Sequence, residues 1–279
     1  MSEVAIRNPT VRIRAKSRRQ IVSLRELLEF RFLLIRLVKR DVILRYRQTV
    51  LGVTWVVLQP LLASGILAFV FGTIASLPSG GVPYYVLSFA GFLGWSAFAA
   101  VITKSTNSLV ASGALVSKVY FPRIFLPLST VGSSLVDVSV GLVVMATILV
   151  VSGVGIPSTI VFVPLLIVGF LTLATGMGCI AAALAVPYRD VAFVVPVVTQ
   201  LLLYGSPVAY SLAAVPASAQ GFVKFNPLTG YLEAMRWALL PNQVLNLTTL
   251  LYSVVLSIVV LCGGLVLFSR FERGFADVI

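Results

Sequence analysis

Six long apolar segments, separated by short polar or Gly/Pro-containing breaks, set what this chain can fold into. They cover residues 50–75, 82–102, 124–151, 159–186, 191–210 and 247–268. A helix of about 20 apolar residues crosses the hydrocarbon core of a bilayer, and every segment reaches that length. We therefore predict an all-α fold: a polytopic membrane protein with six transmembrane helices over residues 50–268.

Composition supports a membrane protein over a soluble one. Of 279 residues, 59% are hydrophobic and 11% are charged, whereas a soluble domain typically has about 25% charged residues. Arg189 and Asp190 separate the fourth and fifth segments, because unpaired charges are costly in hydrocarbon. The segments follow one another too closely for a separate soluble domain. Cys179 and Cys262 lie inside them, and we interpret both as small hydrophobic residues.

Lysine and arginine lie almost entirely on one side of the predicted spans. All but two of the 21 fall in residues 1–49, in residues 103–123, at Arg189 or in residues 269–279. Because such residues are retained in the cytoplasm, we predict cytoplasmic termini in a multi-pass protein of the inner (plasma) membrane. Residues 1–22 and 269–279 are then cytoplasmic tails. We expect the formal net charge of +12 to attract anionic membrane lipid. We do not favour a nucleic-acid partner as the reason for this charge.

Residues 23–49 predict an amphipathic helix in the cytoplasmic interface, too charged to cross the membrane. At 100° per residue, a charged stripe contains Arg25, Glu29, Arg36, Arg40 and Arg47. The opposite apolar arc contains Leu24, Leu27, Leu28, Leu34, Ile35, Val38, Val42 and Tyr46. Arg31, Asp41 and Arg45 interrupt this division and are expected to contact a partner or the next helix. The segment is either a simple membrane anchor or a lever between a cytoplasmic protein and the first span.

Residue types that carry catalysis or bind metals are scarce. The sequence has no histidine, no Gly-rich loop ending in Lys-Ser or Lys-Thr, and no Gly-x-Ser-x-Gly motif. Its nine carboxylates are scattered singly. We therefore predict no catalytic site, no metal and no cofactor bound by this chain, so that energy comes from a partner or from an ion gradient.

Two polar features of the apolar region leave their interpretation open. Asp137 lies in the third segment and is either a functional site or a hydrogen-bonding partner of a serine or threonine, with Ser133, Ser134 and Ser139 nearby in the sequence. Residues 211–246 are too long for a simple hairpin and rather apolar for a free loop. They form either a surface loop among the lipid headgroups or short helices that enter the membrane against protein.

A series of short motifs then follows in a fixed order along the chain. It consists of residues 40–52 (RDVILRYRQTVLG), Trp55, residues 58–61 (LQPL), 91–95 (GFLGW), 107–109 (NSL), 118–123 (KVYFPR), 188–190 (YRD), 206–210 (SPVAY) and 226–228 (NPL). In this order, on a six-span pattern, the motifs resemble the ABC-2 type permeases that export polysaccharides such as O-antigen, teichoic acid and capsule. The resemblance covers about residues 25–275, and residues 1–22 have no counterpart in it.

The resemblance implies a half-transporter. Two copies would pair around a channel for a lipid-linked glycan, and two copies of a separate nucleotide-binding protein, the ABC cassette, would bind ATP and Mg²⁺ and dock on the cytoplasmic side. The implied cassette contacts are Lys118 on a short helix within residues 111–120, the turn at Arg189 and Asp190, and Arg40 and Asp41 on the interfacial helix. A local ion pair that only stops a span remains the alternative for Arg189 and Asp190. Residues 211–246 would form a re-entrant external segment between spans five and six.

Aromatic residues suggest a path for the glycan. A ring offers a flat apolar face for weak contact with the C–H faces of sugars, and Tyr and Trp add a polar edge. The candidate path residues are Trp55, Gln59, Tyr85, Phe89, Phe92, Trp95, Gln200, Tyr204 and Tyr210. Packing between helices or contact with lipid is the alternative for each ring. An exporter of a drug or small lipid, and more remotely an ion-coupled carrier or a membrane enzyme, remain the other candidate functions.

Overall fold

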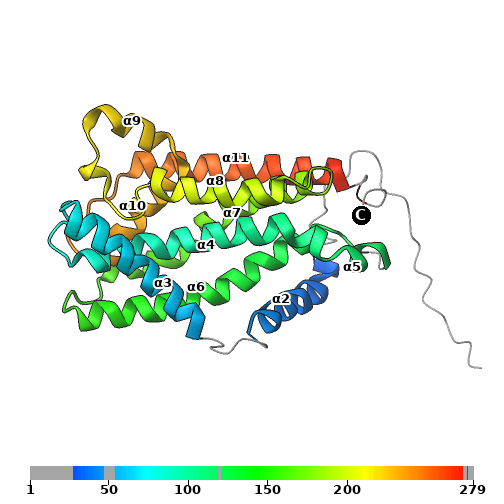
Figure 1. The fold of residues 1–279 in the computed structure, drawn as a ribbon, viewed down its shortest axis with the longest axis horizontal. Coiled ribbons are helices and arrows are strands. Elements are labelled where there is room, and N and C mark those ends of the chain that lie inside the picture. Colours follow the sequence, from blue (N-terminus) through cyan, green and yellow to red (C-terminus); the bar gives the residue numbers. More distant parts are fainter. Residues whose placement is uncertain (1–27, 47–53, 119–120, 273–274, 276–279) are drawn as a thin grey trace, which may run out of the picture.

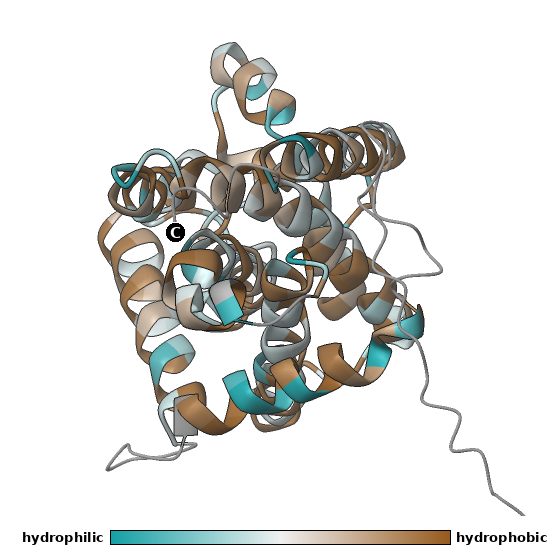
Figure 2. Cartoon of the chain, turned by 90° about the vertical axis from the view of Figure 1, so that its right-hand side faces the viewer, coloured by the Kyte–Doolittle hydropathy of each residue, from teal (hydrophilic) through white to brown (hydrophobic). Residues whose placement is uncertain are grey.

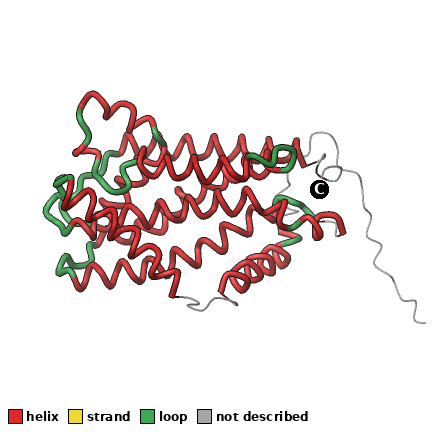
Figure 3. The backbone as a smooth tube through the Cα atoms, viewed as in Figure 1, coloured by secondary structure: helices red, strands yellow, loops and turns green. Residues whose placement is uncertain are grey.

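The computed structural model describes residues 28–46, 54–118, 121–272 and 275. The predicted tail 1–22 lies outside this part, as do residues 23–27 and 47–49 of the predicted interfacial helix. Every regular element in the described part is helical. The long helices run side by side in one bundle, with the connecting loops gathered at its two ends (Figure 3).

Five helices are long and apolar enough to cross a membrane. They are α3 (Thr54–Leu67) continued by the π-helical η1 (Ala68–Ile74), α4 (Tyr84–Ala111), α6 (Phe125–Val151), the 3₁₀ turn η2 (Ser158–Phe162) continued by α7 (Val163–Ala185), and α11 (Leu247–Phe271). Each overlaps one predicted span. The chain is therefore a polytopic helical membrane protein, and hydrophobic residues cover most of the outer helices (Figure 2).

The fifth predicted span, residues 191–210, forms a shorter helix than expected. Its helix α8 (Val191–Gly205) has 15 residues, or about 22 Å at 1.5 Å per residue, against about 30 Å for the hydrocarbon core. The helix ends because Pro207 lacks an N–H and pushes the preceding residue out of the helical region. Ser206 accordingly has φ −111° and ψ 151°.

Shorter helices connect or flank the long ones. They are α2 (Arg31–Tyr46), α5 (Gly113–Lys118), η3 (Leu212–Ala214), α9 (Ala217–Phe225) and α10 (Pro227–Leu239). Figure 1 shows α5 and the α7–α8 turn at one end of the bundle, which we call the α5 end. The α9 and α10 helices lie at the opposite end, which we call the α10 end. The segments rich in Lys and Arg that the structure describes thus share one end.

Helix α4 lies at the centre of the bundle. It packs against α3, α6, α7, α8 and α10, and it is the most enclosed of the five long helices. Close contact between α7 and α11 depends on glycine, because a Cβ at Gly176 or Gly264 would collide with the backbone of the opposite helix. Small residues at such contacts are typical of packing in membranes, where backbones approach closely.

Helix α2 packs on α6 through a face that differs from the predicted apolar arc. Leu37 is buried, and Val38 lies against Gly132 of α6. Leu28 and Ile35 of the predicted arc are 67% and 61% exposed and point away from α6. The packed face therefore includes only part of the predicted arc, which leaves an apolar surface on the outer side of α2.

Candidate functional site

Charged residues that the sequence predicted as partner contacts are exposed at the α5 end. Lys118 ends the short helix α5, and Arg189 and Asp190 form the tight turn between α7 and α8. All three are exposed. Nearby, Arg123 anchors the end of α11, since its NH1 donates to the Glu272 carbonyl at 2.9 Å and its backbone N–H donates to the Glu272 carboxylate at 3.0 Å.

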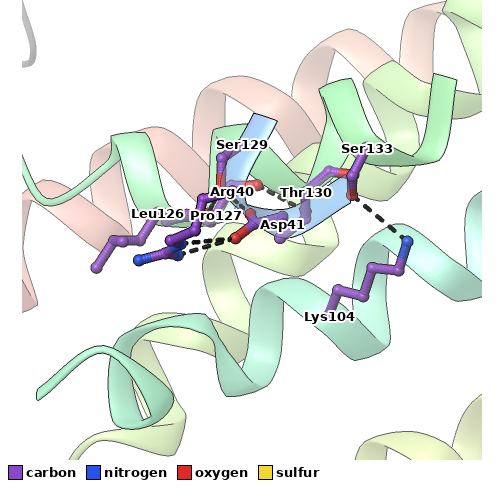
Figure 4. Close-up of polar contacts among 8 residues, drawn as sticks. All are labelled: Arg40, Asp41, Lys104, Leu126, Pro127, Ser129, Thr130 and Ser133. Carbon is purple, nitrogen blue, oxygen red and sulfur yellow. Dashed lines mark hydrogen bonds and ion pairs between the residues drawn. The ribbon is translucent and has the colours of Figure 1, made fainter. Parts of the chain in front are cut away.

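Arg40 and Asp41 are only half-exposed, and they connect α2 to α6 (Figure 4). Arg40 donates from Nε and NH2 to Oδ1 of Asp41, at 3.0 and 2.9 Å. The hydroxyl of Ser129 on α6 donates to the other oxygen, Oδ2, at 2.7 Å. Asp41 therefore bridges two helices, a position consistent with its interruption of the amphipathic pattern of α2.

Asp137 of α6 pairs with Lys104 of α4, and this partner was not indicated by the sequence. The Lys104 ammonium lies 3.2 Å from Oδ2 of Asp137 and 3.4 Å from Oγ of Ser133. The second predicted span ended at residue 102, just before Lys104. Helix α4 instead continues past Ile102 to Ala111, and this extension carries Lys104 to the face of α6.

A cavity of about 700 Å³ lies between α2, α4 and α6, on the side of the bundle near α5. Its lining consists of Arg40, Asp41, Leu44, Lys104, Asn107, Ser108, Ala111, Ser112, Leu126, Ser129, Thr130 and Ser133. Two cations, one carboxylate and six hydroxyl or amide side chains thus share one space. A second cavity of about 120 Å³, deeper in the bundle, brings together Gln59, Phe92 and Asp137 from three helices.

Non-helical backbone is buried at the α10 end, directly after α8. Ser206 and Val208 are fully buried, and a Cβ at Gly91 of α4 would collide with the Val208 carbonyl. Such a segment requires partners for its free carbonyls when water is excluded. The Tyr84 hydroxyl donates to the Ala209 carbonyl at 2.8 Å, and Asn226 donates to the Ser206 hydroxyl at 2.8 Å.

Arg236 on α10 supplies the other partners of this segment and is itself fully buried. Its NH2 donates to the carbonyls of Pro207 and Val208, at 2.6 and 2.8 Å, and its NH1 donates to Glu233 at 2.7 Å. Burial lowers the pKa of Arg236, and the neighbouring Glu233 carboxylate raises it. Sequence analysis did not select this pair. The signal available was an acid and a base three positions apart in a stretch otherwise poor in charge.

The predicted path residues fall into three groups by their exposure. Phe89 and Trp95 of α4 are 0% and 4% exposed and pack inside the protomer, Trp95 against Phe98. Tyr85, Phe92 and Tyr210 are half-buried, with the Tyr210 hydroxyl donating to the Tyr204 carbonyl at 3.1 Å. The exposed group is Trp55, Gln59, Gln200 and Tyr204.

The exposed group lies on α3 and α8, two apolar helices that the bundle covers little. Both helices pack on α4, and both turn large apolar side chains outward. From α3 and η1 they include Leu62, Ile66 and Phe69. From α8 they include Phe193, Val197 and Leu201. In a membrane, lipid or another chain would cover this surface.

Comparison with known proteins gives the family. The model of the ABC-2 type transporter family matches residues 33–240. An O-antigen export system permease protein RfbA of Klebsiella pneumoniae is 26% identical over 256 residues, covering 88% of this chain and 95% of that protein. A protein of the same name from Myxococcus xanthus is 26% identical over 255 residues, covering 91% and 97%. The chain therefore belongs to the ABC-2 type transporter family, as a membrane-embedded transport subunit that carries no ATPase domain.

Proposed function

We propose that the chain is the permease subunit of an ATP-driven exporter that moves a lipid-linked polysaccharide from the cytoplasm across the inner membrane. The observation that carries the proposal is the similarity to O-antigen export permeases over 88–91% of the chain. The ordered motifs along residues 40–228 support it.

The partner is an ATP-binding cassette protein, because ABC-2 permeases work with such proteins. Our proposal is a complex of two permeases and two cassettes, with Lys118, Arg189 and Asp190 as direct contacts on the cassette. Their exposure at the α5 end supports this role. Arg40 and Asp41 have an indirect role in this proposal. Asp41 connects α2 to α6 through Ser129, so a displacement of α2 would be transmitted to the bundle.

The path for the glycan lies between the two copies, along the outward faces of α3 and α8. Trp55, Gln59, Gln200 and Tyr204 are exposed on these helices, and Tyr85, Phe92 and Tyr210 lie half-buried beside them. Phe89 and Trp95 contribute by packing α4 rather than by touching the glycan. The rest of this surface is apolar, which favours a second candidate: export of a small lipid or drug.

In the membrane, α8 and residues 206–210 together form the fifth of six spans, and α9 and α10 enter the outer leaflet without crossing it. The burial of residues 206–210 against Arg236 supports this arrangement, because irregular backbone at membrane depth is stable only against protein or water. The basic residues at the α5 end support a cytoplasmic location of that end and of both termini.

Co-purification tests the proposed function. The chain and its cassette are expressed together, and their stoichiometry is measured by native mass spectrometry alongside ATP hydrolysis. We expect a two-plus-two complex with ATPase activity that a lipid-linked glycan stimulates. A cassette with its phosphate-loop lysine replaced serves as the control without activity. Stimulation by small lipids or drugs but not by glycan would favour the second candidate, and failure to bind any cassette would contradict both.

A further inference from the structure

The two cavities follow the same faces of α4 and α6. We call them the large and the small cavity, of about 700 and 120 Å³. Along α4 their lining residues recur every three or four positions, which places them on one helical face. In chain order these are Leu93, Ser96, Ala97 and Ala100 of the small cavity, then Lys104, Asn107, Ser108 and Ala111 of the large cavity.

On α6 the lining residues show the same spacing in the opposite direction, because α6 runs back along α4. They are Leu126, Ser129, Thr130 and Ser133 of the large cavity, then Ser134, Asp137, Val138 and Gly141 of the small cavity. The two helices pack against each other. The two cavities therefore lie end to end between α4 and α6, with the large cavity toward the α5 end.

The ion pair of Lys104 and Asp137 stands at the boundary between the cavities. Lys104 lines the large cavity and Asp137 lines the small one, and their charged atoms lie 3.2 Å apart. The Lys104 ammonium also reaches Ser133 at 3.4 Å (Figure 4). On α4, Ala100 of the small cavity precedes Lys104 by about one helical turn. A single layer of paired side chains thus separates the two spaces.

The polar groups of the small cavity call for water. Asp137 lies midway along the apolar helix α6, and ionisable groups at such depth typically face the bundle interior or a water-filled cavity. Ser134 is fully buried, and its hydroxyl has no hydrogen-bond partner within the described part of the chain. Leaving a buried hydroxyl unpaired is costly. A volume of about 120 Å³ holds about four waters at ~30 Å³ each.

The large cavity supplies a way for water to enter from the α5 end. Asn107 and Ala111 of its lining are exposed. Its charged groups are paired, since Arg40 binds Asp41 and the Lys104 ammonium binds the carboxylate beyond it. The lining thus presents ion pairs, hydroxyls and an amide without a net charge that would select an ion. Such a surface is suited to water.

The small cavity ends at α3. Val56, Gln59 and Pro60 form its wall on this side. Gln59 is also exposed on the outward face of α3, so this one residue belongs both to the cavity lining and to the surface that we assign to the glycan path. The two cavities together therefore span the distance from the α5 end to that surface.

We propose that the two cavities form one water-filled crevice from the α5 end to Gln59, and that the ion pair of Lys104 and Asp137 is the barrier within it. While the pair is intact, water exchanges slowly between the two spaces, and separation of the pair joins them. Water at Gln59 would then hydrate the hydroxyl groups of a passing glycan. This last use rests on the proposed function, whereas the crevice and its barrier do not.

Reaction of engineered cysteines with silver ions tests the crevice. The full chain with Cys179→Ala and Cys262→Ala is placed in proteoliposomes in nitrate buffer, and it carries one new cysteine, Ser108→Cys in the large cavity or Ala100→Cys in the small one. A silver ion is similar in size to water and binds thiols where water reaches them. Lys118→Cys, at an exposed position of the α5 end, identifies the side of the vesicle to which silver is added. Intact-mass measurement after denaturation and maleimide treatment counts the thiols that remain.

The expected rates follow from the position of the barrier. From the α5 side, Ser108→Cys reacts rapidly, and Ala100→Cys reacts at least tenfold more slowly. Adding Lys104→Ser/Asp137→Ser should raise the rate at Ala100→Cys at least tenfold and change that at Ser108→Cys less than twofold. Thermal unfolding checks that each variant is folded. If this double variant unfolds, Lys104→Gln/Asp137→Asn removes the charges at similar side-chain volume, and it should raise the rate at least threefold.

Four results would overturn the proposal. Failure of Ala100→Cys to react in every background would show a small cavity closed to water, and reaction from the α10 side alone would place its opening at the wrong end. Equal rates at Ala100→Cys and Ser108→Cys with the pair intact would show that the pair is no barrier. The control is Val143→Cys, at a position 68% exposed on α6 and outside both linings. A rate there equal to that at Ala100→Cys would indicate entry through lipid. Because neither cassette nor glycan is present, a negative result would leave the proposed function standing.

Discussion

The two ends of the bundle hold charged residues in different ways. At the α10 end, Arg236 is fully buried and bonds to Glu233 and to two main-chain carbonyls. At the α5 end, Arg40 and Lys104 keep about a third of their side-chain surface exposed beside a cavity of about 700 Å³. A charge sealed from water needs fixed partners, since losing them leaves it unsatisfied. A charge beside an open cavity can exchange its partners at low cost.

This difference assigns different mechanical properties to the two ends. The Arg236 contacts fix the irregular backbone of residues 206–210 between α4 and α10, so the α10 end is a rigid part of the protomer. The contacts of Arg40, Asp41 and Lys104 join α2, α4 and α6 at the end where we propose that the cassette binds. Rearrangement of these contacts would allow α2 to shift relative to the spans while the α10 end keeps its structure.

The largest expected effect is that of Arg236→Ala. The substitution leaves Glu233, whose side chain is 18% exposed, without its cation, and it leaves the buried carbonyls of Pro207 and Val208 without their donor. Removing one partner of a buried pair typically costs about 3–5 kcal/mol. Thermal unfolding of the solubilised protein measures the loss. The control Lys224→Ala, an exposed cation on α9, should change stability by less than about 0.5 kcal/mol. Equal stability of the two variants would contradict a fixed α10 end.

A smaller effect is expected for Lys104→Ala at the other end. Asp137 loses its cation, but it lies beside a cavity, so water can replace part of the lost interaction, and we expect a cost of about 1–2 kcal/mol. Asp137→Asn added to Lys104→Ala should recover part of this loss. A double-mutant cycle on the unfolding free energy gives the coupling between the two residues. A coupling as large as that of Arg236 with Glu233 would remove the distinction between the two ends.

The smallest effect on stability is expected on the exposed surface between the two ends. Tyr204 is 57% exposed, and its hydrogen bond with Tyr210 is made by the main-chain carbonyl of Tyr204, which an alanine would keep. Tyr204→Ala should therefore change the free energy of unfolding by less than about 0.5 kcal/mol. The same substitution should slow glycan export several-fold. Phe89→Ala should instead cost about 3–5 kcal/mol, because this ring is buried. Export assays in vesicles and unfolding measurements separate the two. Unchanged export by Tyr204→Ala and by Trp55→Ala would contradict the proposed path.

These contrasts also show which features could be predicted from the sequence. Long apolar segments identify the spans, because a helix must be apolar along its length to cross lipid. The turns at residues 152–157 and 187–190 were predicted from Gly, Pro and charged residues. The early end of α8 was also readable, since Pro207 disfavours a helical conformation at Ser206.

Other features depend on contacts between helices that no local pattern contains. Lys104 meets Asp137 only because α4 and α6 pack side by side, and Arg236 meets residues 206–210 only because α10 folds back against α4. The placement of aromatic rings has a separate cause. In a membrane protein both the lipid-facing and the packed sides of a helix are apolar, so periodicity does not distinguish buried Phe89 from exposed Tyr204. Three-dimensional packing was needed to make that distinction.

Transport in a reconstituted system tests the central claim most directly. The chain and its cassette are placed together in proteoliposomes loaded with a lipid-linked polysaccharide, and movement of the glycan across the bilayer is followed with and without ATP. We predict ATP-dependent movement with both proteins present and none with the permease alone, with an inactive cassette, or without hydrolysable ATP. Glycan that stays on its original side while the complex hydrolyses ATP and moves a small lipid would contradict the assignment as a polysaccharide exporter.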